Sequence, residues 1–206
     1  ERGHQRSSGA GVCSLQDEAT PSCHPTRGSR QCRRSGPAWV KGSGGDIGSM
    51  KLDGFATLYM DKLESLKGHY ESLDQEDSMV HTLNHCIFNL NSRAPSIDTY
   101  LHGYVPFAHV DHVHSDAVIA IAAAKDQVRL TEEVFGGELG YLPWQRPGID
   151  LGIKLGEMAK ANPNFVGAVL GSHGLFTWGH TAKSSYETTL RIINKEVPES
   201  LRDKRI

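Results

Sequence analysis

The composition of this chain changes sharply near residue 38, and that change limits what can fold. Residues 1–38 contain six arginines, no aromatic residue, and only Val12 and Leu15 as large aliphatic residues. So few apolar side chains cannot bury enough surface to offset the entropy lost on ordering. We therefore expect residues 1–38 to be a disordered or aberrant N-terminal segment, and residues 39–206 to form the folded domain. An RNA-binding arm is the alternative, but interleaved aromatic residues and dense Lys/Arg clusters are absent.

From Trp39 onward, apolar runs, helix caps and turn residues alternate as in an α/β domain. Strands are expected at 55–60, 107–114, 141–144, 165–170 and 175–178, and helices at about 74–88, 117–125, 131–135, 149–161 and from 181 onward. Ser115 or Asp116 caps the alanine-rich helix. In the last helix, Tyr186, Leu190 and Ile193 share one face. Several strand pairs are compatible with hairpins, so the pattern does not demand a purely parallel sheet.

Charge and cysteine content exclude several classes of protein. The 22 Lys+Arg against 24 Asp+Glu leave a net charge of −2, so no net basic field attracts nucleic acid or an anionic membrane. The sequence has no run of about 18 apolar residues and no signal peptide. Its four cysteines form no CxxC pair and no disulfide framework. We expect a cytoplasmic protein with no nucleic-acid or membrane partner.

Histidine is concentrated in one region, because six of the 11 histidines fall between residues 81 and 114. Within it, His112 and His114 lie two positions apart on a predicted strand, so their side chains point to the same face. Imidazole is a good ligand for zinc and related divalent ions. The pair can therefore contribute to a metal site. The alternative, a chance pair on a solvated strand face, is favoured for the pair alone.

A catalytic metal site needs a third protein ligand, and His173 is the best candidate. It lies in a Gly-Ser-His-Gly turn between two apolar strands, where a polar ring has little structural purpose. With His173 added, the metal site and the chance pair are equally favoured. Ligands of one zinc lie about 2.0–2.1 Å from the ion, so the three nitrogens should lie within about 4 Å of one another.

Two further segments carry candidate site residues. Gly42, Ser43 and Gly44 belong to a glycine loop whose backbone N–H groups can bind an anion, although the spacing is not that of a Walker A loop. A flexible turn is the commoner explanation of such a cluster. Ser96 or Asp98 is suited to cap a helix, which is the favoured interpretation from the sequence alone. The alternative for Asp98 is a general base near the metal.

Five motifs in order resemble one family: WVKGSGGDIGSM, APSIDTYLH, HVDHVHSDAVIAIAA, YLPWQRPGIDLG and SHGLFTWGHT. They are similar to the class II aldolase/adducin head domain, and most similar to the aldolase half of bifunctional rhamnulose-1-phosphate aldolase/alcohol dehydrogenase proteins. The resemblance runs from about Trp39 to Asn194. It implies an α/β fold of three layers, α/β/α, with a mostly antiparallel central sheet. It also implies a homotetramer whose active sites lie between neighbouring subunits.

The resemblance assigns roles to the candidate residues. It implies that His112, His114 and His173 hold a divalent metal, generally zinc, and that Asp98 is the catalytic carboxylate. The substrate phosphate would bind at Gly42, Ser43, Gly44 and Ser96. The implied reaction cleaves a deoxyketose 1-phosphate, rhamnulose 1-phosphate, to dihydroxyacetone phosphate and lactaldehyde. The metal polarises the ketose carbonyl, and the carboxylate moves the proton.

The chain departs from the family pattern at several points. Asp98 stands where many relatives have glutamate, residues 1–38 lack the family's Gly-Asn-Thr-Ser phosphate loop, and no dehydrogenase half follows. Tyr141 is out of register with the tyrosine that donates a proton in some relatives. The alternatives are therefore another sugar-phosphate enzyme of the superfamily, an epimerase or dehydratase, and an inactive fragment or adducin-like interaction module.

Overall fold

The central sheet has five strands, four of which come from the domain expected after residue 38. The computed structural model describes residues 9–12, 36–44, 48–88 and 93–195. The order across the sheet is β1 (Gly9–Val12), β4 (His109–Val113), β7 (Gly174–Gly179), β6 (Gly167–Leu170) and β5 (Leu139–Leu142). Every neighbouring pair is antiparallel except β5 and β6. The expected mixed α/β fold with a mostly antiparallel sheet is confirmed.

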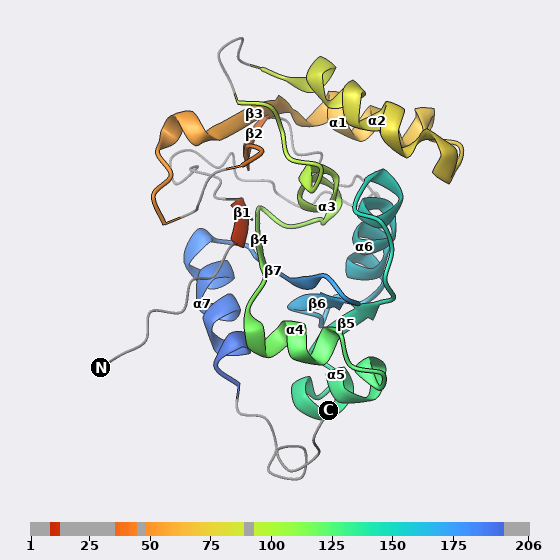
Figure 1. The fold of residues 1–206 in the computed structure, drawn as a ribbon. Coiled ribbons are helices and arrows are strands. Elements are labelled where there is room, and N and C mark those ends of the chain that lie inside the picture. Colours follow the sequence, from red (N-terminus) through yellow and green to blue (C-terminus); the bar gives the residue numbers. More distant parts are fainter. Residues whose placement is uncertain (1–8, 13–35, 45–47, 89–92, 196–206) are drawn as a thin grey trace, which may run out of the picture.

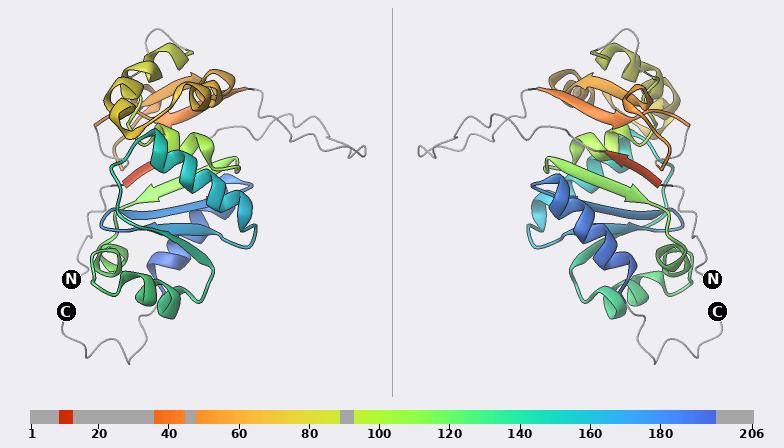
Figure 2. Two further views of the ribbon diagram at one scale, coloured as in Figure 1. Left: turned by 90° about the vertical axis from the view of Figure 1, so that its right-hand side faces the viewer. Right: turned by 90° about the vertical axis from the view of Figure 1, so that its left-hand side faces the viewer.

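Helices cover both faces of this sheet. Alternate residues of its strands point to opposite faces, so their side chains belong to two separate hydrophobic cores. Phe176 and Leu170 belong to the larger core, whereas Leu175 and Val169 belong to the smaller one on the other face. The helices of the larger core include α1 (Met60–Ser65), α3 (Thr99–Tyr104) and α6 (Ile149–Ala161), and those of the smaller core are α4 (Asp116–Ala122), α5 (Gln127–Phe135) and α7 (Ala182–Ile193). Figure 2 shows α6 and α7 on opposite faces of the sheet.

A second layer of strands lies beyond the sheet, at the top of Figure 1. β2 (Pro37–Lys41) pairs antiparallel with β3 (Phe55–Tyr59). This hairpin carries the glycine loop at the end of β2, and α1 follows directly from β3. Val40, Ala56 and Leu58 bury their side chains in the larger core, so the glycine loop is fixed to the face of the sheet that α3 covers.

Local sequence signals explain where several helices begin and end. The Ser115 hydroxyl accepts a hydrogen bond from the Val118 N–H and caps α4, as expected. Thr181 and Ser184 form a capping box at the start of α7. Gly136 ends α5 in the left-handed conformation at φ 62°. The buried Glu76 carboxylate accepts from the Ile149 and Asp150 N–H groups at the start of α6.

Some element boundaries differ from the prediction. The helix expected at 74–88 is a short α2 (Glu76–Thr82) flanked by the 3-10 turns η3 (Leu73–Gln75) and η4 (Leu83–Cys86). Two further 3-10 turns are η1 (Leu52–Gly54) and η2 (Leu66–His69). The strand expected at 141–144 begins two residues earlier, because Leu139 pairs with Gly167 of β6. None of the helices in the described ranges is long and apolar enough to cross a membrane.

The buried face of α7 is not the apolar one that the sequence suggested. Tyr186 is 60% exposed and Leu190 is 39% exposed, whereas Ser185 and Thr189 are buried. The reason is Asp111 of β4, whose carboxylate accepts hydrogen bonds from the Ser185 hydroxyl at 2.6 Å and the Thr189 hydroxyl at 3.3 Å. A partly buried carboxylate is stabilised by such donors, and together with Ile192, which is buried in the smaller core, they account for the face of the helix that turns inward.

Two pieces of the segment 1–38 differ from the expectation of disorder. Residues 9–12 form β1, in which Ala10 is paired with His112 of β4. Residues 37–38 open β2, so this strand starts before Trp39. An edge strand is held by backbone hydrogen bonds, which need no large apolar side chains. The expectation is wrong at these residues, and residues 1–8 and 13–35 lie outside the described part of the chain.

Candidate metal centre

His112 is the most deeply buried member of the histidine cluster, with no exposed surface. It lies opposite Phe176 of β7, and the two rings stack at 4.1 Å between centroids and 11° between planes. Its Nδ1 atom lies 2.9 Å from the Leu175 carbonyl oxygen. A carbonyl only accepts, so Nδ1 carries the proton and Nε2 keeps a free lone pair. That tautomer is the one a metal ligand requires.

His114 brings a second lone pair to the same place. Its Nε2 atom lies 2.9 Å from Nε2 of His112, which confirms that the two side chains share one face of the strand. Nitrogens this close either share a proton or ligate one ion. Because Nδ1 of His112 already holds its proton, either His114 donates to His112 or both lone pairs are directed at a cation.

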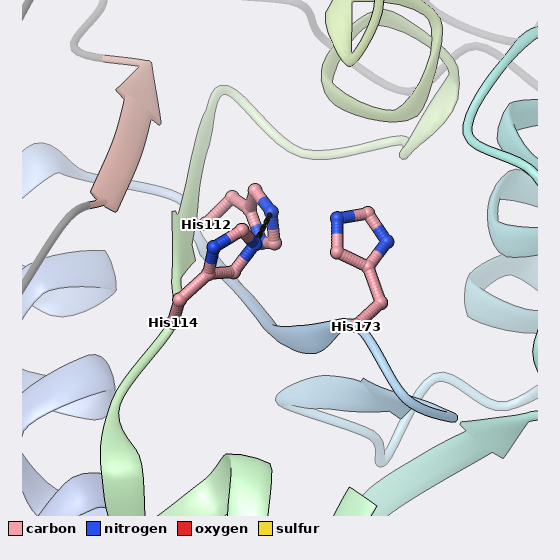
Figure 3. Close-up of side chains that lie close together, drawn as sticks. All are labelled: His112, His114 and His173. Carbon is pink, nitrogen blue, oxygen red and sulfur yellow. Dashed lines mark hydrogen bonds between the residues drawn. The ribbon is translucent and has the colours of Figure 1, made fainter. Parts of the chain in front are cut away.

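His173 completes the cluster from the turn between β6 and β7. Figure 3 shows one of its ring nitrogens facing His112 and His114. The candidate ligand nitrogens of all three residues lie within 4.8 Å of one another. Nitrogens bound at about 2.1 Å to a tetrahedral zinc lie about 3.4 Å apart, so a pair at the 4.8 Å limit must close by about 1.4 Å. This limit also exceeds the expected separation of about 4 Å, so the three residues fit a metal site only after their rings move closer together.

The turn that carries His173 brings β7 close to the histidine rings. Ser172 has a φ of 51°, a left-handed conformation that is uncommon for a residue with a Cβ. Its N–H donates to the Ala122 carbonyl at 2.7 Å, which fixes the turn to the end of α4. A Cβ on Gly174 would lie 2.6 Å from Cδ2 of His114 and 2.8 Å from the Val113 carbonyl oxygen. Only glycine lets β7 lie this close to the two rings.

Burial favours the neutral, metal-binding form of the His112 and His173 rings. It lowers the pKa of His112 well below its usual range, and the neighbouring His173 lowers it further. The pKa of His173 is also lowered by burial, although the Asp98 carboxylate acts in the opposite direction. Neutral imidazole is the ligand form, so the environment favours metal binding at neutral pH.

Asp98 lies near this cluster, because its charge acts on His173. It occupies the residue before α3, but its side chain makes no capping bond there, whereas the Ser96 hydroxyl, the other expected cap, accepts a hydrogen bond from the Asp98 N–H at 3.3 Å. One carboxylate oxygen, Oδ2, lies 3.3 Å from the Ser96 hydroxyl. The other, Oδ1, is buried and has no hydrogen-bond partner among the described residues. A buried carboxylate oxygen left unpaired in this way is available to a ligand or a transferred proton.

The glycine loop and the Ser96 segment lie side by side, but the Gly42 and Ser43 N–H groups donate to the Gly54 and Ala94 carbonyls and are not free to bind an anion as expected. Gly42 forms an isolated antiparallel bridge with Pro95, and the Ser43 N–H donates to the Ala94 carbonyl at 2.9 Å. The structure therefore places Gly42, Ser43 and Gly44 against the segment that leads through Ser96 to Asp98. The buried Lys41 ammonium donates to the Gly44 carbonyl at 3.0 Å and holds the loop closed.

The other clustered histidines lie apart from the three candidate ligands or play another part. His81 and His85 are exposed, and His109 is buried at the start of β4. His102 is also buried, and its ring lies 5.2 Å from Phe176 and 6.4 Å from His112. Burial lowers the pKa of His102 to about 3, so this ring packs as a neutral group behind the metal centre.

Sequence reasoning missed Ser172, Gly174 and Phe176 as parts of the site. Phe176 reads as an ordinary core residue, and its stacking on His112 depends on the register of β4 with β7. The glycines that flank Ser172 and His173 were the available signal. They mark a tight turn, but they do not reveal which side chains come near it.

Comparison with known proteins identifies one family. Residues 29–194 match the profile described as Class II Aldolase and Adducin N-terminal domain. The match begins ten residues before the expected start at Trp39 and ends at Asn194, as expected. The chain is also 36% identical over 166 residues to a Bacillus subtilis protein named uncharacterized oxidoreductase YuxG. That alignment covers 81% of this chain but only 24% of YuxG, so the chain spans about a quarter of this relative.

Solved structures agree with this assignment. One is the N-terminal class II aldolase domain of a conserved protein from Thermoplasma acidophilum, with a TM-score of 0.68 and 28% identity. The similarity covers 77% of this chain and 72% of that chain. A second is YgbL from Klebsiella pneumoniae, a putative aldolase/epimerase/decarboxylase, with a TM-score of 0.61. It covers 97% of this chain and 82% of that chain at 14% identity, so it supports the fold alone.

Proposed function

Because the chain belongs to the class II aldolase and adducin N-terminal domain family, we propose that it is a metal-dependent aldolase. The observation that carries this proposal is the convergence of His112, His114 and His173, with the His112 ring oriented by a hydrogen bond to the Leu175 carbonyl. The proposed metal is zinc, whose usual ligands include histidine nitrogens. An adducin-like interaction module has no need of such a centre, so the three histidines favour an enzyme.

The proposed substrate is a deoxyketose 1-phosphate, specifically rhamnulose 1-phosphate. Its support is the resemblance of five separated motifs to the aldolase half of bifunctional rhamnulose-1-phosphate aldolase proteins. The products would be dihydroxyacetone phosphate and lactaldehyde. The name oxidoreductase belongs to YuxG as a whole, of which this chain covers only a part, and it is not carried over. We also propose a cytoplasmic homotetramer, the arrangement that the resemblance implies.

Different residues of the chain would have different roles in such a reaction. A bound metal would supply Lewis-acid polarisation of the ketose carbonyl. When the C3–C4 bond breaks, the C4 hydroxyl loses its proton and becomes the aldehyde oxygen, while C3 gains a proton, so no net proton is lost. Asp98 would deliver the proton at C3 and would remove it in the synthetic direction. Its unpaired Oδ1 and its proximity to His173 support this role. Gly42, Ser43, Gly44 and Ser96 would orient the phosphate, which fixes the carbonyl relative to the metal.

The test measures cleavage of rhamnulose 1-phosphate by the zinc-, cobalt- or manganese-loaded protein, as dihydroxyacetone phosphate released. Asp98→Asn should lower kcat by about 100- to 10,000-fold without changing the metal content. Asp74→Asn, which changes an exposed carboxylate in η3, is the matched control and should leave the rate unchanged.

Three results would contradict the proposal of a metal-dependent aldolase. One is the absence of cleavage from a protein that binds metal. Another is conversion of a sugar phosphate to an epimer or a dehydrated product, which would assign the same centre to an epimerase or a dehydratase. The third is cleavage that persists in His112→Ala, which would separate the reaction from the metal centre.

A further inference from the structure

Arg93 lies across the glycine loop and belongs to none of the motifs that assign the phosphate site. Its guanidinium Nη1 atom donates to the Ser43 carbonyl at 3.3 Å. The same atom would lie 4.0 Å from a Cβ placed on Gly44. The side chain is exposed, so its remaining N–H groups are accessible from the solvent. A cation therefore lies directly beside the residues expected to hold the substrate phosphate.

Arg93 is held at two points, its stem and its guanidinium. A Cβ on Gly42 would lie 2.6 Å from both Cγ and Cδ of Arg93, so the stem lies flat on this glycine. The backbone on either side of the contact is joined by the Ser43 to Ala94 hydrogen bond and the Gly42 to Pro95 bridge. An arginine held at its stem and at its head has lost much of its rotamer freedom before a ligand arrives.

The charge of Arg93 has no partner of opposite sign in the described ranges. No carboxylate there forms an ion pair with Arg93 or with Lys41, the other cation of the loop. A guanidinium has five N–H donors in a planar fork, and the Ser43 carbonyl uses only one nitrogen. The geometry of the remaining donors suits two oxygens of a phosphate.

The same segment connects this cation to the catalytic carboxylate. The segment from Arg93 to Asp98 is short, and the Ser96 hydroxyl donates to the Asp98 carboxylate at 3.3 Å. Asp98 in turn acts on His173 of the metal centre. One end of this segment would thus bind the phosphate, and its other end carries Asp98, the proposed proton-transfer group. The length of the segment would set how far the reacting carbon lies from the bound phosphate.

We propose that Arg93 binds the phosphate group of the substrate, together with the loop at Ser43 and Gly44. The proposal rests on the proposed sugar-phosphate function for its substrate, but the anion site itself stands on the loop geometry. Arg93 supplies charge that the serine and glycine residues of the loop lack. It is a binding residue for the phosphate and takes no part in the proton transfer.

The test compares Arg93→Gln and Arg93→Lys with the parent protein, all loaded with metal. Binding of inorganic phosphate is measured by calorimetry at fixed ionic strength, and kcat and KM are measured for the ketose with and without its phosphate. Loss of a charge-assisted pair should weaken phosphate binding by about 10- to 100-fold and raise KM equally for the phosphorylated ketose alone. Lysine keeps the charge and should restore part of the affinity.

The matched control is Arg129→Gln, which removes an exposed arginine of α5 that pairs with Asp126 and Glu133. It should leave phosphate binding unchanged. Equal phosphate affinity in Arg93→Gln and the parent would overturn the proposal, as would an equal rise in KM for both ketoses. If no sugar phosphate is cleaved but Arg93→Gln still weakens phosphate binding, the aldolase proposal fails and the Arg93 site stands.

Discussion

His112 is the residue on which the metal centre depends, because three neighbours fix its ring. Phe176 stacks on one face, the Leu175 carbonyl accepts a hydrogen bond from its Nδ1–H, and Nε2 of His114 lies 2.9 Å from its Nε2. The pairing of His112 with His114 follows from strand periodicity and was predictable. The contacts of the ring were not, because they depend on how β4 is aligned with β7, and no local pattern encodes that alignment.

Gly174 is the residue whose replacement should disturb the centre most directly without removing a ligand. In Gly174→Ala the new Cβ would meet Cδ2 of His114 and the Val113 carbonyl oxygen, and the carbonyl belongs to the backbone. We expect metal affinity to fall by at least about tenfold, as measured by competition with a chromophoric chelator. Gly68→Ala is the control, because its Cβ meets nothing within 4 Å. Equal affinity in the two variants would show that β7 can move away at no cost.

His102 should make the stability of the protein depend on pH. Burial lowers its pKa to about 3, against about 6.5 in an unfolded chain. Between these values the unfolded chain holds the extra proton, so stability falls as the pH falls, by about 1.4 kcal/mol per pH unit. Urea unfolding in the presence of a chelator should show the parent losing about 2 kcal/mol more than His102→Gln between pH 7 and pH 5. Equal losses of stability in the parent and in His102→Gln over this pH range would contradict the prediction.

Among the elements, α7 is a helix whose buried face differs from the one that its sequence pattern predicts. Its existence and its start were predictable from the capping residues at Thr181, but its orientation was not. Tyr186 and Leu190 are exposed, because the inward face binds the partly buried Asp111 carboxylate and places Ile192 in the smaller core. Burial raises the pKa of Asp111, and the Ser185 and Thr189 hydroxyls oppose that shift by binding the charged form.

Removing one of the hydroxyl donors to Asp111 should lower the free energy of unfolding by more than the same substitution at an exposed serine. Ser185→Ala breaks the 2.6 Å bond to Asp111 and should lower the free energy of unfolding by about 1–3 kcal/mol. Ser65→Ala makes the same chemical change at the exposed end of α1 and should alter stability by less than about 0.5 kcal/mol. Chemical denaturation of both variants checks the difference. If Ser185→Ala lowers the free energy of unfolding no more than Ser65→Ala does, Asp111 does not depend on the Ser185 hydroxyl.

At the scale of the whole molecule, composition predicted the class of fold but misjudged its N-terminal limit. The alternation of strands and helices after Trp39 was sufficient to predict an α/β domain, and α6 was predicted with its observed bounds, Ile149–Ala161. β1 could not be predicted, because a strand that extends a sheet by its backbone leaves no apolar signature in Gly9–Val12. The family match from residue 29 likewise extends into the compositionally unusual segment.

The metal centre joins parts of the chain that are distant in sequence, and its formation is therefore a property of the whole fold. β4 supplies His112 and leads into His114, whereas the turn between β6 and β7 supplies His173. The sheet order places β7 beside both β4 and β6, so all three rings meet at one place. Spacing suggested the pair of His112 and His114, and the turn and the family resemblance suggested His173. The nitrogens lie within 4.8 Å of one another, a wider limit than the expected separation of about 4 Å.

The most direct test of the central claim is the number of zinc ions bound per chain, measured by elemental analysis after equilibrium dialysis. The parent protein and His81→Ala, a control that changes an exposed histidine of α2, should each bind one zinc per chain. His112→Ala, His114→Ala and His173→Ala should each bind much less at the same free zinc concentration. Full zinc binding by a protein that lacks all three histidines, or none by the parent, would contradict the account.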